Sequence, residues 1–490
     1  MHCAAEGIPA MTRVCIKRRA ALVGSGAIAL EALVAAPARA LNQYDVIVVG
    51  AGLSGLHAAH LMQEEGLDVQ VIEGRHRVGG RILTLDNIPG NPEAGGNGIA
   101  AGYGRVIDAA ERYGTPLINI ADRARLITHR ELVLDHKLIP RDQWPNHPRN
   151  ILPASHKEIM PWSFTPVFII QNNPLVSYAD WLAPESERFD VPLYDWMVEK
   201  GLKDEQIDLV YHINADFGNS AHDVSALMLF FVYSWGMMQR SIKPRGTFAA
   251  KGGNQRIPEA MAAALHNEVH FGREVIGLRS ENGGAEVHCA DGTIYRAKRV
   301  VCSIPVAVLR KIKLEPRLSG AQAKGVRMLG RQKLTQSHIV AKAPYWEEDG
   351  FRPGMFADSI AGNVMAQHFG DNPNEVTSLI AWHKGYKAER LDQVPEKDAK
   401  AMVIADLESI RPAAKGKLEV VGFKSWYNDP FAAGDWTVWE PGQIAEFHKA
   451  LAKPHGRIHF CGEHTSVSNR GMEGAMESGE RVAFEVFDVI

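Results

Sequence analysis

Three glycines near the N-terminus have the spacing of a phosphate-binding turn. They are Gly50, Gly52 and Gly55, in the run Gly-Ala-Gly-Leu-Ser-Gly that also contains Ser54. Glycine at the first position permits a tight turn, and glycine at the second lets a pyrophosphate approach the backbone. The third glycine lets a helix pack closely on a strand. These residue types and their spacing predict a dinucleotide-binding site.

The sequence around these glycines supplies the elements that must position them. Residues 45–49, Asp-Val-Ile-Val-Val, are typical of a buried parallel strand. Residues 56–66 predict a helix that ends at Gly66, and residues 68–73 predict a second strand that ends at Glu73. The pyrophosphate would lie at the helix N-terminus, where free N–H groups and the helix dipole favour an anion. We expect the carboxylate of Glu73 to accept hydrogen bonds from a ribose.

The next segment, Gly-Arg-His-Arg-Val-Gly-Gly-Arg at 74–81, narrows the choice of dinucleotide. With this segment the chain resembles the flavin-dependent amine oxidase family, whose members include monoamine, polyamine and L-amino acid oxidases. The resemblance implies that the cofactor is FAD and that Gly80 and Arg81 contact its diphosphate and ribityl chain. A guanidinium at Arg81 suits bidentate binding to phosphate.

Further segments extend the resemblance to the C-terminus, although it is weak between about 125 and 245. Residues 93–97 resemble the family's second glycine pair, which implies that Gly96 and Asn97 lie close to the flavin ring. Val275 matches the position that meets the adenine. Residues 457–483 resemble the last flavin-binding segment of the family, in which the matching positions are Gly462, Glu463 and Met472.

The resemblance also implies a reaction. Flavin N5 accepts a hydride from the carbon beside an amine nitrogen, and water hydrolyses the resulting imine to an aldehyde or ketone. Family members often hold the amine between two aromatic rings. Trp436 falls on the position of one ring, whereas Gly471 stands at the other, so half of this cage is missing. The alternative interpretation of Trp436 is an indole packed in the core.

Two departures from the family pattern concern the cofactor and the electron acceptor. Asp435 stands where monoamine oxidases have the cysteine that binds flavin covalently, so we expect non-covalent FAD. Gln336 stands where the family usually has a lysine that holds a water at flavin N5. We take Trp436 and Gln336 as the candidate catalytic residues. Without the lysine, a protein electron acceptor is an alternative to oxygen.

Several alternatives to a simple amine substrate stay open. An L-amino acid oxidase would need an arginine that faces the flavin and binds the carboxylate. Arg245 and Arg470 are candidates, although we expect both at the surface. A flavin desaturase or isomerase would act on a lipophilic substrate, and a non-catalytic escort protein is a third alternative. The aromatic side chains of a predicted buried helix at 222–240 line the pocket or pack in the core: Phe230, Tyr233 and Trp235.

Composition excludes several other classes of function. The 54 Lys and Arg residues nearly balance the 57 Asp and Glu residues, for a formal net charge of -3. The chain therefore lacks the basic character of a nucleic-acid-binding protein. Its 5 cysteines include no Cys-x-x-Cys pair, and the histidines show no His-Glu-x-x-His pattern, so neither disulfides nor a metal are indicated.

The first forty residues are typical of an export signal. Lys17, Arg18 and Arg19 precede an apolar run that is too short for a membrane span, and Ala38-Arg39-Ala40 resembles a cleavage site. The arginine pair indicates the twin-arginine route. We therefore expect an exported, periplasmic protein with no stable membrane span, and both Met1 and Met11 are candidate start residues.

These segments together predict an α/β protein with the amine oxidase fold. It would combine a Rossmann-like FAD-binding domain with a discontinuous α+β substrate domain, and a small-molecule amine would bind between them. A homodimer is compatible with this plan. The predicted boundaries are 1–40 for the signal peptide, 41–125, 245–335 and 435–490 for the FAD-binding domain, and 126–244 and 336–434 for the substrate domain.

Overall fold

The computed structural model describes residues 40–123, 129–243, 246–370 and 372–490. The predicted export signal up to position 39 lies outside the described residues. So does Arg245, one of the two candidate carboxylate-binding arginines.

A seven-stranded sheet carries the glycine-rich turn. Its strand order is β11-β8-β9-β10-β1-β2, and β19 also pairs with β10. The apolar run predicted as a strand forms the end of β1, which is parallel to β2 and β10 and fully buried from Val46 to Val49. The strands are β1 (Ala40–Val49), β2 (Val69–Ile72), β8 (Val275–Glu281), β9 (Gly284–Cys289), β10 (Ile294–Cys302), β11 (Lys313–Glu315) and β19 (Ile458–Phe460).

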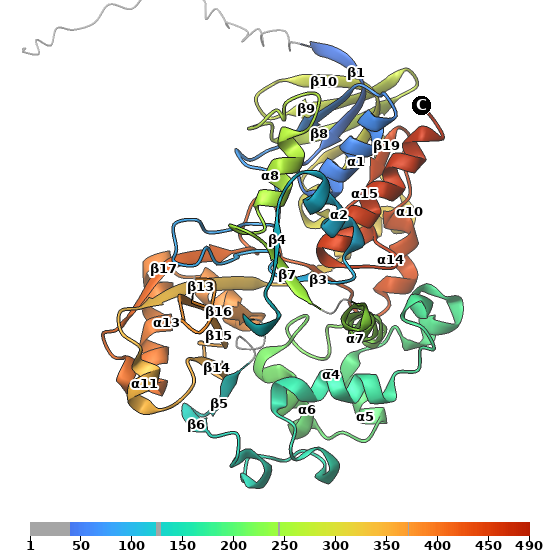
Figure 1. The fold of residues 1–490 in the computed structure, drawn as a ribbon. Coiled ribbons are helices and arrows are strands. Elements are labelled where there is room, and N and C mark those ends of the chain that lie inside the picture. The colour runs from blue at the N-terminus through green and yellow to red at the C-terminus, as the bar shows by residue number, and fades with distance from the viewer. Residues whose placement is uncertain (1–39, 124–128, 244–245, 371) are drawn as a thin grey trace, which may run out of the picture. The chain divides into compact units, whose positions relative to one another are not determined.

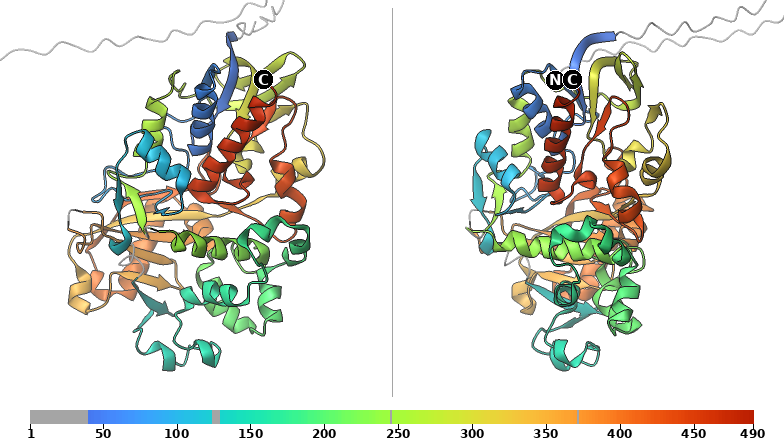
Figure 2. Two further views of the ribbon diagram at one scale, coloured as in Figure 1. Left: turned by 45° about the vertical axis from the view of Figure 1, so that its right-hand side comes forward. Right: turned by 90° about the vertical axis from the view of Figure 1, so that its right-hand side faces the viewer.

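Two helices lie side by side along this sheet, α1 (Leu53–Glu64) and α15 (Gly471–Phe487) (Figures 1 and 2). A Cβ on Gly479 of α15 would lie 2.3 Å from the carbonyl oxygen of Ser54 in α1. The helices approach this closely because glycine has no side chain. Shorter helices complete this part of the fold: α2 (Gly104–Arg112), α8 (Arg256–Ala263), α9 (Val306–Leu309), α10 (Gly320–Met328) and α14 (Gln443–Leu451).

A second seven-stranded sheet is mostly antiparallel and has the order β17-β13-β16-β15-β14-β5-β6. Helix α13 (Glu396–Ile410) packs Val403 and Leu407 into the core of this sheet. The strands are β5 (Arg130–Leu134), β6 (Lys137–Ile139), β13 (Leu334–Ala341), β14 (Gly354–Ala357), β15 (Asn363–Gln367), β16 (Ser378–Lys384) and β17 (Leu418–Ser425), with helices α11 (Tyr345–Asp349) and α12 (Tyr386–Asp392).

A group of helices with an aromatic core stands beside the second sheet (Figure 1). These helices are α4 (Pro161–Asn172), α5 (Leu193–Glu199), α6 (Asp204–Val210) and α7 (Ala226–Ser241). The predicted buried helix is α7. Its Phe230 is fully buried, and its ring centroid lies 4.9 Å from that of Trp196. Phe230 is therefore a core residue and not a pocket residue.

Two small sheets join these parts, with the orders β3-β7-β4 and β12-β18. Their strands are β3 (Ile99–Ala100), β4 (Leu117–Asn119), β7 (Thr247–Ala250), β12 (Gly330–Arg331) and β18 (Thr437–Val438). Residues from Arg39 to Ile490 constitute one compact unit, so the division into two domains stays a prediction.

Three features bear on membrane, metal and disulfide chemistry. Within the described part of the chain, no helix is long and apolar enough to cross a membrane, and no three metal-binding side chains cluster. Cys289, Cys302 and Cys461 are buried free thiols. Burial raises the pKa of each thiol to about 12, so all three stay protonated at neutral pH.

Candidate functional site

A cavity of about 450 Å³ begins at the carboxyl ends of β1, β2 and β10, where Gly50, Glu73 and Ser303 line it. Ligands of open parallel sheets bind at such an edge. The residues predicted to bind the cofactor or to act in catalysis all line this cavity except Gly55, namely Gly50, Gly52, Ser54, Glu73, Gly80, Arg81, Gly96, Asn97, Val275, Gln336, Trp436, Gly462, Glu463 and Met472. The candidate arginine Arg470 is not among the lining residues, although its neighbour Gly471 is.

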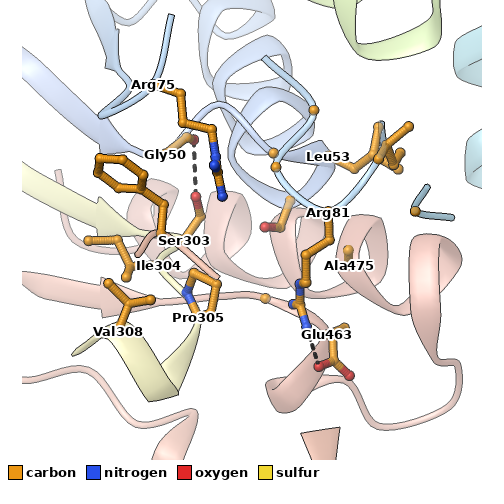
Figure 3. A pocket seen from close by; sticks show the side chains of 18 of the residues that line it. Gly50, Leu53, Arg75, Arg81, Ser303, Ile304, Pro305, Val308, Glu463 and Ala475 are labelled. Carbon is orange, nitrogen blue, oxygen red and sulfur yellow. Dashed lines mark hydrogen bonds and ion pairs between the residues drawn. The ribbon is translucent and has the colours of Figure 1, made fainter. Parts of the chain in front are cut away.

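The glycine-rich turn forms one wall. Gly50 has a φ of +103°, and a Cβ there would lie 2.6 Å from the hydroxyl of Ser303, which donates to the Gly50 carbonyl (3.0 Å; Figure 3). A Cβ on Gly52 would meet no protein atom within 4 Å and would occupy space that a ligand needs. Gly52 also precedes α1 without a side-chain cap, so the first N–H groups of the helix remain free for an anion.

Gly55 acts through packing. A Cβ there would lie 2.1 Å from the Gly50 carbonyl oxygen, so the absence of a side chain lets α1 approach the turn.

Near Glu73, two segments that are distant in sequence contact each other. The carboxylate of Glu73 accepts hydrogen bonds from the backbone N–H groups of Ala51 and Arg75, each at 2.9 Å. Arg75 also pairs with the buried Asp429 (2.5 Å), which Lys424 contacts as well. Burial alone would raise the pKa of Asp429, but Arg75 and Lys424 lower it to about 2.

Arg81 and Glu463 form an ion pair in the middle of the cavity wall, with 3.1 Å between Nη1 and Oε1 (Figure 3). Glu463 Oε1 also accepts from the backbone N–H of Thr437 (2.9 Å) and from its hydroxyl (2.6 Å). Burial would raise the pKa of Glu463, but Arg81 and Thr437 bring it below its ordinary value. Glu463 is therefore ionised, and its Oε1 accepts all three of these bonds.

The second glycine pair lies against the start of α15. A Cβ on Gly96 would lie 3.0 Å from the sulfur of Met472, and the Gly96 carbonyl accepts from the side chain of Asn254 (2.9 Å). The carboxylate of Glu93 accepts hydrogen bonds from the backbone N–H of Asn254 (2.6 Å) and from the hydroxyl of Thr84. Burial raises the pKa of Glu93 to about 8.

Trp436 and Gln336 lie at another part of the cavity, together with Trp382 of β16. The ring centroid of Trp436 is 6.2 Å from that of Trp382 and 5.8 Å from that of Phe217. With its amide oriented to satisfy both partners, Gln336 donates to the Ala94 carbonyl (3.1 Å) and accepts from Trp382 Nε1 (3.2 Å). We refer to this part of the cavity, with Tyr103 and Gly471, as the aromatic end.

Tyr103, which the sequence analysis missed, lies at the gap left by Gly471. Its hydroxyl is 4.0 Å from the point where a Cβ on Gly471 would lie, and both residues line the cavity. Tyr103 precedes α2, and its ring centroid is 5.8 Å from that of Trp235. A tyrosine from another segment therefore lies near the position of the missing ring. The sequence alone carries no sign of this contact, because it joins Tyr103 to the distant C-terminal segment.

Arg470, expected at the surface, is partly buried. The guanidinium carbon of Arg470 lies 4.7 Å from the centroid of the Phe217 ring, beside the aromatic end. Its side chain keeps some accessible surface, yet the surrounding protein lowers its pKa through burial. Arginine usually stays in water, and composition alone gave no signal of this burial.

Asp435 stands where a covalent flavin link would require a cysteine, and its side chain also lines the cavity. Burial raises the pKa of Asp435 to about 7, although Arg81 opposes the shift. Asp435 is therefore partly protonated near neutral pH.

The lining residues fit the expected FAD. Free helix N–H groups and Arg81 suit a diphosphate, Glu73 retains lone pairs for ribose hydroxyls, and glycines at Gly52 and Gly96 leave room where a side chain would intrude.

Comparison with known proteins points to one family. The family described as flavin containing amine oxidoreductase matches residues 53–487. The flavin-containing amine oxidase B of Homo sapiens is 28% identical over 467 residues, which cover 91% of this chain and 86% of the human protein. A putative L-amino-acid oxidase, YobN, of Bacillus subtilis is 26% identical, with coverage of 90% and 94%.

Solved structures agree on the fold. Putrescine oxidase bound to putrescine superimposes with a TM-score of 0.73 at 22% identity, covering 92% of this chain and 100% of that chain. Cyclohexylamine oxidase from Brevibacterium oxydans gives a TM-score of 0.73 at 20% identity, with coverage of 91% and 99%. The predicted fold class, an α/β amine oxidase fold, is confirmed.

Proposed function

The chain belongs to the family of flavin containing amine oxidoreductases, and from this premise we propose that it oxidises a small amine to an imine, which water hydrolyses to an aldehyde or ketone. Membership of this family favours an enzyme over a non-catalytic escort protein. The protein is an FAD-dependent amine oxidoreductase, and FAD, when bound, supplies the hydride acceptor.

The aromatic end of the cavity carries this proposal. Trp436, Trp382 and Tyr103 line it, next to the wall where Gly96 meets Met472. A weakly solvated aromatic environment disfavours an ammonium ion and so favours the neutral amine, which has the lone pair needed to form the C=N bond. Gln336 fixes the orientation of Trp382 through its amide and acts as a positioning residue.

Four finer points belong to the same proposal. FAD is bound without a covalent link, because the matching position is Asp435 and not cysteine. The electron acceptor is oxygen or a protein, the enzyme is exported to the periplasm by the twin-arginine route, and it forms a homodimer. Acid precipitation tests the first point, since non-covalent FAD would leave the protein and enter the supernatant.

The reaction class is tested by mixing the purified holoenzyme without oxygen with a panel of amines and amino acids while the flavin absorbance is followed. Bleaching by any member supports amine oxidation. Subsequent addition of oxygen or cytochrome c then identifies the acceptor. A firmly bound flavin that no member of the panel bleaches would contradict the proposal and favour a desaturase or isomerase.

A further inference from the structure

Arg470 is a partly buried cation that has no ion-pair partner in the described part of the chain. It precedes α15 and Gly471, and its guanidinium faces the ring of Phe217 at 4.7 Å. Within the part of the chain that the structure describes, no carboxylate lies within ion-pair distance of this guanidinium, and none of its N–H groups has a hydrogen-bond acceptor. A partly desolvated charge without a protein partner costs free energy, and a ligand that supplied the partner would recover it.

The acidic groups around Arg470 are engaged elsewhere. Glu463 binds Arg81 and Thr437. Asp216, which precedes Phe217, accepts from the hydroxyl of Tyr233 (3.1 Å) and pairs with Lys384 (3.2 Å).

Two acidic groups act on Arg470 electrostatically, Glu463 most strongly and Asp435 more weakly. Neither forms an ion pair with its guanidinium, because Glu463 instead pairs with Arg81 at 3.1 Å. The N–H groups of Arg470 therefore stay available to a ligand.

Tyr103 supplies a second donor at the same place. Its hydroxyl has no hydrogen-bond partner among the described residues, and it lies 4.0 Å from where a side chain on Gly471 would begin. Burial raises the pKa of Tyr103 to about 12, against an opposing effect of Arg470, so the hydroxyl keeps its proton. The absence of a side chain at Gly471 leaves room beside both donors.

We propose that Arg470 and Tyr103 form a carboxylate-binding subsite, so that the substrate is an amine that carries a carboxylate, such as an amino acid. A guanidinium binds a carboxylate through two parallel N–H bonds, and the phenol adds a third donor. This inference rests on the proposed amine oxidation, since the carboxylate belongs to the molecule whose amine reaches the flavin.

The test uses the holoenzyme and pairs of compounds that differ only in a carboxylate. The pairs are L-phenylalanine with 2-phenylethylamine, L-leucine with 3-methylbutylamine, and L-lysine with cadaverine. In anaerobic reduction, wild type should favour the amino acid of at least one pair. Arg470→Met should reduce kcat/KM for that amino acid by roughly 30- to 1,000-fold, as expected for loss of a buried charged partner. The rate with the matching amine should not fall.

Two further variants separate charge from geometry. Arg470→Lys keeps the charge but not the bidentate geometry, so it should recover only part of the loss. Tyr103→Phe removes one hydroxyl and should reduce kcat/KM for the amino acid by about 10-fold, the effect of a single hydrogen bond to a charged group. Arg188→Met is the matched control, because Arg188 also lies 4.7 Å above a phenylalanine ring, that of Phe189, but is exposed, and neither it nor its sequence neighbours line the cavity. This control should change nothing.

Binding without turnover gives a second readout. Benzoate should perturb the flavin spectrum of wild type and the Arg188→Met control in a saturable manner, but should do so much more weakly with Arg470→Met. FAD content and the melting temperature of each variant show whether it has folded.

The outcomes separate this inference from the proposed function. Amines that bleach wild type as well as or better than their amino acids, without benzoate binding, would overturn the subsite and leave amine oxidation standing. Bleaching by no compound would contradict amine oxidation. In that case benzoate binding that depends on Arg470 would still support the subsite, and its absence would overturn it.

Discussion

The two ends of the cavity differ in how their polar groups are satisfied. At the cofactor end, the carboxylates of Glu73, Glu463 and Asp429 each accept two or more hydrogen bonds from protein groups. At or beside the aromatic end, the guanidinium of Arg470, the hydroxyl of Tyr103 and the indole N–H of Trp436 have no partner among the described residues. Protein groups thus bind the carboxylates of the cofactor end, whereas these three donors are left to a ligand or to water.

This contrast shows which features serve stability and which serve recognition. A charge that the protein pairs contributes to folding, and its loss leaves the partner buried and unpaired. A donor that the protein leaves unpaired contributes little to folding, and its loss should affect ligand binding alone. Four predictions test this division.

The largest effect is expected at Gly55. A Cβ there would lie 2.1 Å from the backbone oxygen of Gly50, and no flexible side chain can move aside. Gly55→Ala should destabilise the protein by about 3 kcal/mol or more and should abolish FAD binding. Urea unfolding and flavin content measure both effects.

Gly52→Ala is the matched control for that change. A Cβ on Gly52 meets no protein atom within 4 Å, so the stability of the FAD-free protein should change by less than about 1 kcal/mol. FAD affinity should fall because the methyl group enters the cavity. Equal destabilisation by the two substitutions would contradict the distinction between packing and binding glycines.

Next in size is Glu463→Gln, which leaves Arg81 without its carboxylate. We expect a loss of about 2–4 kcal/mol in the free energy of unfolding of the FAD-free protein, since the partly buried guanidinium would lose its charged partner and keep only the Asp435 carbonyl. Chemical denaturation measures this loss. A loss below about 0.5 kcal/mol, the range of a surface ion pair, would contradict the inference that this ion pair contributes to folding.

A smaller, pH-dependent effect is expected from Asp435. Its pKa is about 7 in the folded protein and near 3.8 when unfolded, so the folded state binds the proton more tightly. The resulting stabilisation is full below pH 3.8 and is lost as the pH rises to 7. Because Asp435 faces the cavity and its water, we expect a fall of only about 1–2 kcal/mol.

The Asp435→Asn variant isolates this contribution. The difference in unfolding free energy between wild type and variant, measured without FAD from pH 4 to pH 8, should decrease and then level off above pH 7. A difference that does not vary with pH would show that Asp435 has an ordinary pKa.

The smallest effects compare two tyrosines. The buried hydroxyl of Tyr211 donates to the Phe217 carbonyl (2.7 Å), so Tyr211→Phe should cost about 1 kcal/mol of stability. Tyr103→Phe should cost nothing measurable, because the hydroxyl of Tyr103 has no partner in the described part of the chain. Thermal denaturation of the two variants tests this comparison. A loss of stability in Tyr103→Phe would mean that its hydroxyl forms a hydrogen bond within the protein.

The sequence predicted the cofactor end well because local backbone geometry determines it. The glycine spacing, the apolar strand and the terminal Glu73 all lie within 30 residues of one another, and their order restricts the fold. The partners of these groups could not be predicted in the same way. Arg75 meets Asp429 across 354 positions, and Arg81 meets Glu463 across 382.

The aromatic end was predicted least well. Trp436 and Gln336 were located through matching positions, but Tyr103 matches no family position and Arg470 has a side chain that composition assigns to the surface. Both owe their position to packing between α2, α15 and the loop that carries Phe217. Tertiary contact of this kind leaves no periodic signal in the sequence.

The close crossing of α1 and α15 has a consequence for the distance between the two ends. Gly479 packs against the Ser54 carbonyl with no side chain between them, so any larger residue at 479 would push α15 away from α1. The start of α1 borders the diphosphate position, and the start of α15 carries Arg470 and Met472. A larger side chain at position 479 would therefore change the spacing between the cofactor and the proposed carboxylate subsite.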